Sequence, residues 1–408
     1  MRKSLILIFF AFCLVSLGFR FYIYDKANLK PENGSKVAFK TRVLSEVKAN
    51  SRIQSFSLSF KGYRIYVNSP LYPQISYGDM VMAEGTIGYK KLGTREIIVL
   101  DSPKIKPDSA QFSLLNPIYS TRQRLIEIFQ SYLPPEEASL LLGIVFGVRE
   151  SFSPQFYEEL QKAGVLHVIA ASGMNISMLG ALLAGFFGVF LKRQMAIVMT
   201  CIGIVLFAAL AGFEPSIVRA SIMGLLAFSA QILGRQSWAL LGAAIAGFIM
   251  LFVSPSLIKD IGFQLSFTAT LGLVYIPPII QKAIPVKRAP VIKLVGEDII
   301  TTISAQISTL PIILANFGTY SIWSVLVNSI VLWTVPLLMI IGGVTAILAL
   351  LFEPFGNLLY LALPLLWYFK LVVRFFGQFG QLSISIFPWQ IQIAYYSFIF
   401  AAIVWRKK

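Results

Sequence analysis

Residues 164–177 read GVLHVIAASGMNIS, and this stretch opens a long apolar run. It contains His167, the only histidine of the 408 residues, and five residues later the pair Ser172 and Gly173, followed by Asn175. Polar side chains beside a glycine in an apolar run of this length are costly, because lipid offers them no hydrogen-bond partners. The cluster therefore faces a protein interior or a wet cavity. Close helix packing through small residues and a functional role both stay open from the residue chemistry alone.

The composition around this stretch is that of a polytopic membrane protein. Hydrophobic residues make up 56% of the chain and charged residues 13%, whereas soluble domains carry about 25% charged residues. The net charge of +16 fits a topology signal in cytoplasmic loops and does not by itself imply nucleic acid. Cys13 and Cys201 lie far apart in apolar runs, so we expect two small buried side chains and no disulfide. With a single histidine and no cysteine cluster, we expect neither a metal site nor a cofactor.

The first 110 residues divide into two parts. Residues 1–24 combine a basic start with a short apolar run and lack a small-residue cleavage site, which predicts an uncleaved signal-anchor helix with a cytoplasmic N-terminus. Residues 25–110 predict a small OB-like β-barrel domain outside the cytoplasm. Its five expected strands alternate between apolar and polar residues and cover residues 37–43, 52–60, 63–67, 80–87 and 96–100.

Aromatic and basic side chains interleave in this predicted β domain. OB barrels often bind single strands by stacking bases on aromatic rings in a basic groove. In the alternative interpretation, the aromatic rings fill the core of a small domain and the basic groups are simply solvated. The candidate contacts to a nucleic-acid strand are Phe56, Phe60, Lys61, Tyr63, Arg64 and Tyr66.

Residues 111–163 form a transition to the membrane region. Helical spacing over residues 119–132 predicts an interfacial amphipathic helix. Residues 138–148 follow two prolines and two acids and predict an apolar helix that is too short for a crossing of about 20 residues. We therefore expect a re-entrant or interfacial helix there, followed by another amphipathic helix over residues 154–162.

Residues 164–408 predict a transmembrane helical bundle. Together with the anchor it makes ten crossings, and nearly all basic loops fall on the side of the N-terminus, which places both termini in the cytoplasm. Arg374 falls on the opposite side. The nine crossings of this region are expected at residues 165–190, 194–212, 214–234, 237–253, 258–281, 297–316, 322–350, 355–379 and 389–405.

Ionisable and amide side chains recur inside these predicted crossings. Arg219 stands near a helix start, Asp260 and Gln264 lie one turn apart just before Ser266, and Asn328 lies in a later helix. Intramembrane polar groups of this kind usually face a partner or a cavity and often have a function. For Arg219 and Asp260 the alternative is a structural ion pair or a side chain that reaches the interface, since both lie near helix ends.

Four stretches in order resemble the ComEC-type competence family, the channel for DNA uptake in bacterial transformation. A single one would be weak evidence, but four in the same order are specific, and they cover about residues 135–345. The stretches are AGVLHVIAASGMN at 163–175, PSIVRASIM at 215–223, DIGFQLSF at 260–267, and AQISTLP at 305–311 followed by NFG at 316–318 and by Asn328.

The resemblance implies a non-enzymatic channel in the bacterial cytoplasmic membrane that passes single-stranded DNA during natural transformation. Its partners would be single-stranded DNA and the lipid bilayer. Arg219 could meet phosphates, whose charge dominates nucleic-acid binding. The candidate path residues are His167, Ser172, Gly173, Asn175, Arg219, Asp260, Gln264, Ser266 and Asn328.

Many members of this family also carry a metallo-β-lactamase-like nuclease domain. Its His-x-His-x-Asp-His motif cannot be built with only His167, so we expect a separate nuclease to degrade the other strand. The sequence also shows no P-loop, so an ATP-driven step would need a cytoplasmic motor protein. A DNA-receptor protein outside the membrane is a further expected partner.

Two other functions stay open at this point. Ser172 resembles the nucleophile of rhomboid-type intramembrane proteases, which need a base within hydrogen-bond reach. His167 lies five residues earlier, and a regular helix would hold the two side chains about 140° apart, which disfavours that interpretation. The other alternative is a transporter of another anionic substrate, or a membrane protein of the same fold without uptake activity.

Overall fold

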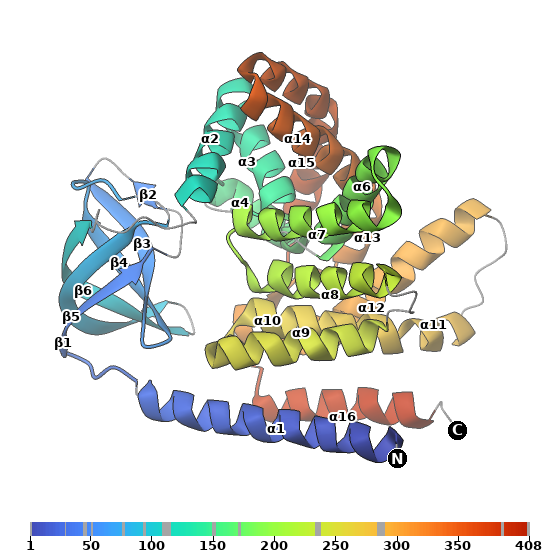
Figure 1. Ribbon diagram of the computed structural model, residues 1–408, viewed down its shortest axis with the longest axis horizontal. Coiled ribbons are helices and arrows are strands. Elements are labelled where there is room, and N and C mark those ends of the chain that lie inside the picture. Colours follow the sequence, from blue (N-terminus) through green and yellow to red (C-terminus); the bar gives the residue numbers. More distant parts are fainter. Residues whose placement is uncertain are drawn as a thin grey trace. The chain divides into compact units, whose positions relative to one another are not determined.

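The computed structural model divides into two compact units (Figure 1). The first unit holds residues 1–123 and 251–256, and the second unit holds residues 124–250 and 257–408. The structure describes residues 2–28, 30–43, 47–49, 52–75, 78–92, 95–107, 116–148, 152–169, 173–232, 238–283, 290–384 and 387–405.

The first unit contains a long helix and a six-stranded sheet. The helix α1 (Arg2–Ala27) includes the predicted anchor, although the side chains of residues 1–10 lie outside the described part of the chain. All five predicted strands are confirmed, and the two-residue β2 is an addition. The strands are β1 (Lys36–Arg42), β2 (Lys48–Ala49), β3 (Ile53–Phe60), β4 (Tyr63–Pro70), β5 (Met80–Leu92) and β6 (Arg95–Pro107).

The predicted closed barrel is wrong. The described strands form an open sheet in the order β1-β5-β6-β4-β3-β2, in which β4 and β6 pair in parallel and the other neighbours are antiparallel. A barrel needs a continuous ladder between its first and last strands. In the described residues, β1 and β3 are joined only by one isolated bridge, from Val43 to Leu58. The sheet is strongly coiled without being closed (Figure 1).

Alternating side chains explain the core of this unit. Along β4, Ile65 and Val67 are buried while Arg64 and Tyr66 point outward, as the two-residue period of a strand requires. Leu58 is buried on the neighbouring strand β3, and the buried apolar residues of β3, β4, β5 and β6 form one cluster.

The second unit is helical and begins within α2 (Asn116–Tyr132). It also contains the 3₁₀ segment η2 (Glu353–Ala362) and the last three residues of a second 3₁₀ segment, η1 (Pro255–Lys259). Apart from the end of α9, its further helices are α3 (Pro135–Phe146), α4 (Pro154–Ala163), α5 (Leu166–Ile169), α6 (Gly173–Phe190), α7 (Arg193–Leu210), α8 (Pro215–Ile232), α9 (Ala239–Val253), α10 (Ile261–Tyr275), α11 (Pro277–Ala283), α12 (Pro290–Phe317), α13 (Ser324–Val331), α14 (Thr334–Leu351), α15 (Leu363–Gly377) and α16 (Trp389–Trp405). A two-residue pair, β7 (Thr319–Tyr320) with β8 (Leu382–Ser383), joins two of the loops.

The chain is a multi-pass membrane protein, and the part of it that the structure describes holds fewer candidate spans than the ten crossings predicted. Seven of the described segments are long and apolar enough to span a bilayer. Helices α9 and α16 are apolar, but with 15 and 17 residues they are shorter than each of these segments. The seven segments are 173–190, 193–210, 215–232, 261–281, 299–317, 334–351 and 353–377.

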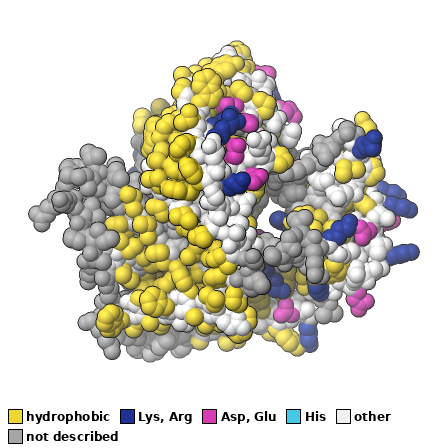
Figure 2. Space-filling model, turned by 180° about the vertical axis from the view of Figure 1, so that it is seen from behind, with side chains coloured by type: hydrophobic (Ala, Val, Ile, Leu, Met, Phe, Trp, Pro, Cys, Tyr) yellow, Lys and Arg dark blue, Asp and Glu magenta, His cyan; other side chains and the backbone are white. Residues whose placement is uncertain are grey.

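Exposed apolar side chains support this assignment. Hydrophobic side chains cover much of the helical surface in Figure 2. Leu351 is 80% exposed, and many other large apolar side chains of the second unit are also exposed. A soluble protein rarely carries such an extensive apolar surface, whereas lipid accommodates it.

The short helix α3 forms the centre of the packing in the second unit. Leu140, Leu141, Leu142 and Ile144 have no exposed surface and belong to a cluster that includes residues of α13, α14 and α15. The prediction of a short apolar helix here is confirmed. The residues that gave it a membrane-like composition are buried against other helices.

An ion-pair network fastens the start of α3 to α15. Lys370 Nζ lies 2.7 Å from Glu137 Oε1 and 2.8 Å from Glu136 Oε2, and the Glu137 side chain is 7% exposed. Arg374 Nη2 lies 2.7 Å from the same Glu136 oxygen and Arg374 Nε lies 3.8 Å from Glu159 Oε2. The hydrogen bond from Lys370 lowers the pKa of Glu136 below its usual value. Arg374, which fell on the unexpected side of the predicted topology, therefore has acidic partners within the protein.

Candidate functional site

The second unit contains a half-open cavity of about 1350 Å³ between its helices. Side chains of α5, α6, α8, α10, α12 and α13 contribute to its wall. Its volume exceeds the range of about 300–1,000 Å³ that is usual for small-molecule sites. Five of the predicted path residues line it, namely His167, Gly173, Arg219, Ser266 and Asn328.

Arg219 is held in the cavity wall by neutral groups. Its Nε donates to Ser266 Oγ at 2.7 Å, and its Nη1 donates to Thr270 Oγ1 at 2.5 Å. The guanidinium carbon lies 5.8 Å from the centre of the Phe267 ring. These three partners come from consecutive turns of α10, while Arg219 comes from α8, so the packing of the two helices sets the position of the guanidinium group.

Among the described residues that line the cavity, Arg219 is the only charged side chain apart from the titratable His167. It is 9% exposed, and within the described part of the chain no carboxylate forms an ion pair with it. A buried cation is costly unless a counter-charge compensates it. The wall therefore offers a positive charge that an anion entering the cavity could neutralise.

The quoted stretch at residues 164–177 shapes another side of the cavity. Gly164 ends α4 in the left-handed region at φ 77°, which side chains other than glycine rarely adopt. A Cβ atom there would clash with Ser324 Cβ and would lie 2.9 Å from Ser321 Cβ. This turn therefore presses directly on the start of α13 and leaves the exposed His167 side chain facing the cavity. The predicted break at Ser172 lies outside the described residues.

Other predicted path residues have their side chains engaged in the fold. Asn175 is 1% exposed, and its Nδ2 donates to the backbone oxygen of Ile144 in α3 at 2.7 Å. Asp260 Oδ1 accepts from the Phe263 backbone N–H at 2.8 Å as the N-cap of α10, and Gln264 Nε2 donates to the Ile258 carbonyl at 2.8 Å. None of these three residues is among those that line the cavity.

Several cavity residues were missed by sequence reasoning. Thr270 follows Ser266 by one helical turn, and that spacing could have identified it as a second neighbour of Arg219. Gln306 marks a helix in the sequence, but nothing there reveals that its amide oxygen accepts from Tyr320 Oη at 2.7 Å or that its Nε2 donates to Ser324 Oγ at 2.8 Å. These contacts join residues 14 and 18 positions apart across a loop.

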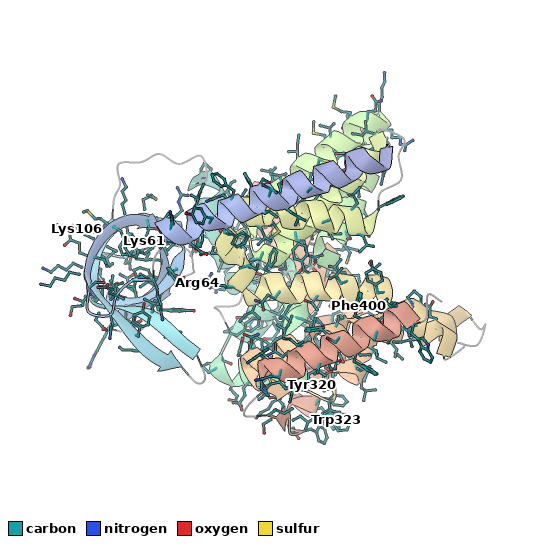
Figure 3. All side chains as sticks on the ribbon, turned by 90° about the horizontal axis from the view of Figure 1, so that it is seen from below. Lys61, Arg64, Lys106, Tyr320, Trp323 and Phe400 are labelled. Atoms are coloured by element: carbon teal, nitrogen blue, oxygen red, sulfur yellow. The ribbon has the colours of Figure 1, made fainter. Side chains whose placement is uncertain are left out.

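The residues of the β domain that were predicted to contact single-stranded DNA are divided between its core and its surface. Phe56 is buried, and Phe60 and Tyr63 pack against the core cluster as partly buried residues. Tyr66 and Arg64 are exposed on β4. Lys61 is exposed, with its Nζ 5.5 Å from the centre of the Phe60 ring. Figure 3 shows Lys61 and Arg64 on the sheet, together with Lys106.

Comparison with known proteins covers most of the second unit. The family model described as competence protein matches residues 144–408. ComE operon protein 3 of Bacillus subtilis (strain 168) is 27% identical over 260 residues, which are 62% of this chain and 32% of that protein. The chain thus spans about a third of the length of the curated relative that it matches. No solved structure matches it.

Proposed function

The chain belongs to the competence protein family, and from this premise we propose that it takes part in DNA uptake during bacterial transformation. More specifically, we propose that the second unit passes single-stranded DNA across the cytoplasmic membrane and that the cavity is part of its path. The observation that supports this proposal most is the single guanidinium group of Arg219 in the wall of a large, otherwise uncharged cavity.

The chemistry of this wall suits a moving polyanion. A strand in transit must be bound strongly enough to enter and weakly enough to leave, as in other membrane pathways. One arginine offers a planar fork of donors that matches a phosphate, and its neutral partners Ser266 and Thr270 leave the charge uncompensated. Successive phosphates could therefore occupy the same contact one after another.

The surroundings of the path are part of the same proposal. Residues 1–24 would anchor the chain, residues 25–110 would form the domain outside the cytoplasm, and both termini would lie in the cytoplasm. Residues 111–163 would connect that domain to the channel of residues 164–408. The exposed Tyr66 and Arg64 would be the first contacts for an incoming strand. A receptor outside, a separate nuclease and an ATP-driven motor would supply the other steps.

The test measures entry of phosphorus-labelled DNA into a transformable host whose own homologue is deleted. The host carries either the unchanged chain or one of two variants. Arg219→Gln removes the charge, and we expect uptake to fall by about tenfold or more, because a hydrogen bond to a charged group contributes about 1.5–3 kcal/mol. Arg219→Lys keeps the charge without the fork, and we expect partial uptake.

The membrane level of each variant is measured in parallel, so that loss of the protein is not mistaken for loss of transport. Unchanged uptake with Arg219→Gln at normal protein level would refute the role of Arg219. If the unchanged chain restores no uptake at all, DNA is not the cargo. Transport of another anion would then be measured with the same variants, since a lone cation suits any anionic substrate.

A further inference from the structure

A second polar cluster lines the cavity and contains no charged group. It comprises side chains from α12, β7, the following loop and α13. Tyr320 donates to Gln306, which in turn donates to Ser324. Asn328 lies one helical turn after Ser324, and Ser321 lies just before α13. All five side chains belong to the cavity wall, and Figure 3 shows Tyr320 among the helices of the second unit.

Two members of this cluster have polar atoms without partners. The Asn328 side chain is 1% exposed, and neither its amide nitrogen nor its amide oxygen has a hydrogen-bond partner among the described residues. Ser321 is 5% exposed, and its Oγ is also without a partner there. Buried polar atoms are nearly always paired, so each exception needs an explanation. Both residues border a cavity in which a ligand could supply the missing bonds.

The surrounding packing holds these polar atoms in place. Val327 and Val331 flank Asn328 on α13 and have no exposed surface, which fixes the rotation of that helix. The turn at Gly164 packs closely against Ser321 and Ser324. The amide of Asn328 therefore cannot turn toward lipid without moving α13, and its orientation is set before any ligand arrives.

We propose that Asn328 and Ser321 form a subsite for the hydrogen-bonding edge of a nucleobase, separate from the phosphate contact at Arg219. This inference rests on the proposed function. An uncharged cluster favours a neutral ligand group over a phosphate. An asparagine amide presents a donor beside an acceptor, the pattern with which proteins contact base edges. The Ser321 hydroxyl can rotate to donate or to accept a hydrogen bond, so it can bind the edges of different bases one after another.

The experiment compares two probes on the purified full chain in lipid nanodiscs. One is a fluorescent single-stranded thymidine 12-mer, and the other is an abasic 12-mer with the same sugar-phosphate backbone. We expect Asn328→Ala to weaken binding of the thymidine 12-mer about tenfold, which corresponds to about 1.4 kcal/mol, and to leave binding of the abasic 12-mer unchanged. Ser321→Ala should act in the same direction with a smaller change.

Two control variants separate this subsite from other effects. Ser329→Ala changes the residue beside Asn328, whose hydroxyl donates to the Val325 carbonyl within α13 and does not line the cavity. It should leave binding of both probes unchanged. Arg219→Gln should weaken both probes by the same factor, because both carry phosphates.

The outcomes distinguish this inference from the proposed function. If Asn328→Ala weakens both probes equally, or neither, while Arg219→Gln weakens both, the base subsite is refuted and the phosphate contact stands. If the unchanged chain binds neither probe, the proposed function fails and the subsite fails with it. The thermal midpoint of each variant is measured without DNA. Removing an unpaired buried amide should not lower it, and a lower midpoint for both Asn328→Ala and Ser321→Ala would show that the cluster serves only the fold.

Discussion

Gly272 in α10 lies close to Ser304 and Ser308 of α12, and replacing it with alanine tests that packing directly. A Cβ atom at this position would clash with Ser308 Oγ and would lie 2.6 Å from Ser308 Cβ and 2.8 Å from the backbone oxygen of Ser304. The serine hydroxyl could rotate away, but its Cβ and the backbone oxygen of Ser304 move only with α12. We therefore expect Gly272→Ala to lower the free energy of unfolding by about 1–3 kcal/mol, the usual cost of overpacking.

A matched control and a rescue make this prediction specific. Gly343 lies in α14, and a Cβ atom there would have nothing within 4 Å, so Gly343→Ala should be neutral or stabilising by up to about 1 kcal/mol through helix propensity. Adding Ser308→Gly to Gly272→Ala removes two of the three close atoms and should restore part of the loss. The assay is denaturant unfolding of the purified chain in mild detergent. Equal unfolding free energies for Gly272→Ala and Gly343→Ala would refute the close crossing of α10 and α12.

Three further predictions concern single contacts. Because the pKa of Glu136 is lowered from 4.5, its contribution to stability is present above that pH and is lost as pH falls through the lower folded value. The unfolding midpoint should therefore fall more steeply from about pH 5 to about pH 3 in the unchanged chain than in Glu136→Gln, and parallel curves would contradict this. Pro311 cannot donate to the carbonyl of Ile307, which instead accepts from Tyr395 Oη at 2.9 Å. Tyr395→Phe should cost about 1 kcal/mol of unfolding free energy and should cost less when Pro311→Ala restores the helical donor; equal costs in both backgrounds would show that the tyrosine bond is unrelated to the proline. Asn175→Ala should lower the unfolding free energy by about 1–3 kcal/mol, since it leaves a buried backbone carbonyl of α3 without that donor, and denaturant unfolding that shows no loss would count against this bond.

Local patterns in the sequence were sufficient to predict these strands and helices. The five alternating segments of the β domain became strands because a two-residue period buries one face of each strand and exposes the other. The short apolar helix before residue 148 and the amphipathic helix that follows were also correct. For the site, the arginine motif around Arg219 and the serine at Ser266 were identified as candidates, and both line the cavity. Side-chain type was informative here because a polar group in an apolar run needs a partner or a wet cavity.

The directions in which side chains point, and the contacts between residues distant in sequence, could not be predicted from local patterns. Asp260 and Gln264 were predicted as path residues from their type alone; in the structure Asp260 caps the start of α10 and Gln264 donates to the Ile258 carbonyl. The difference depends on rotamers and on the exact helix start, which residue types do not specify. The open sheet was likewise not predictable, because closure depends on the pairing of strands distant in sequence. Two of the predicted crossings correspond to α9 and α16, which are shorter than the seven candidate spans of the described residues.

The sequence by itself determined that this chain is a membrane protein with a small β domain and a competence-type helical region. Composition and motif order are properties of consecutive residues, and they are sufficient for class and family. Only the tertiary structure decided that Arg219 meets Ser266 and Thr270, residues 47 and 51 positions away, and that Asn328 faces the same cavity. The physical reason is that hydrogen bonds and burial depend on distance in space, and the packing of α8, α10, α12 and α13 sets those distances.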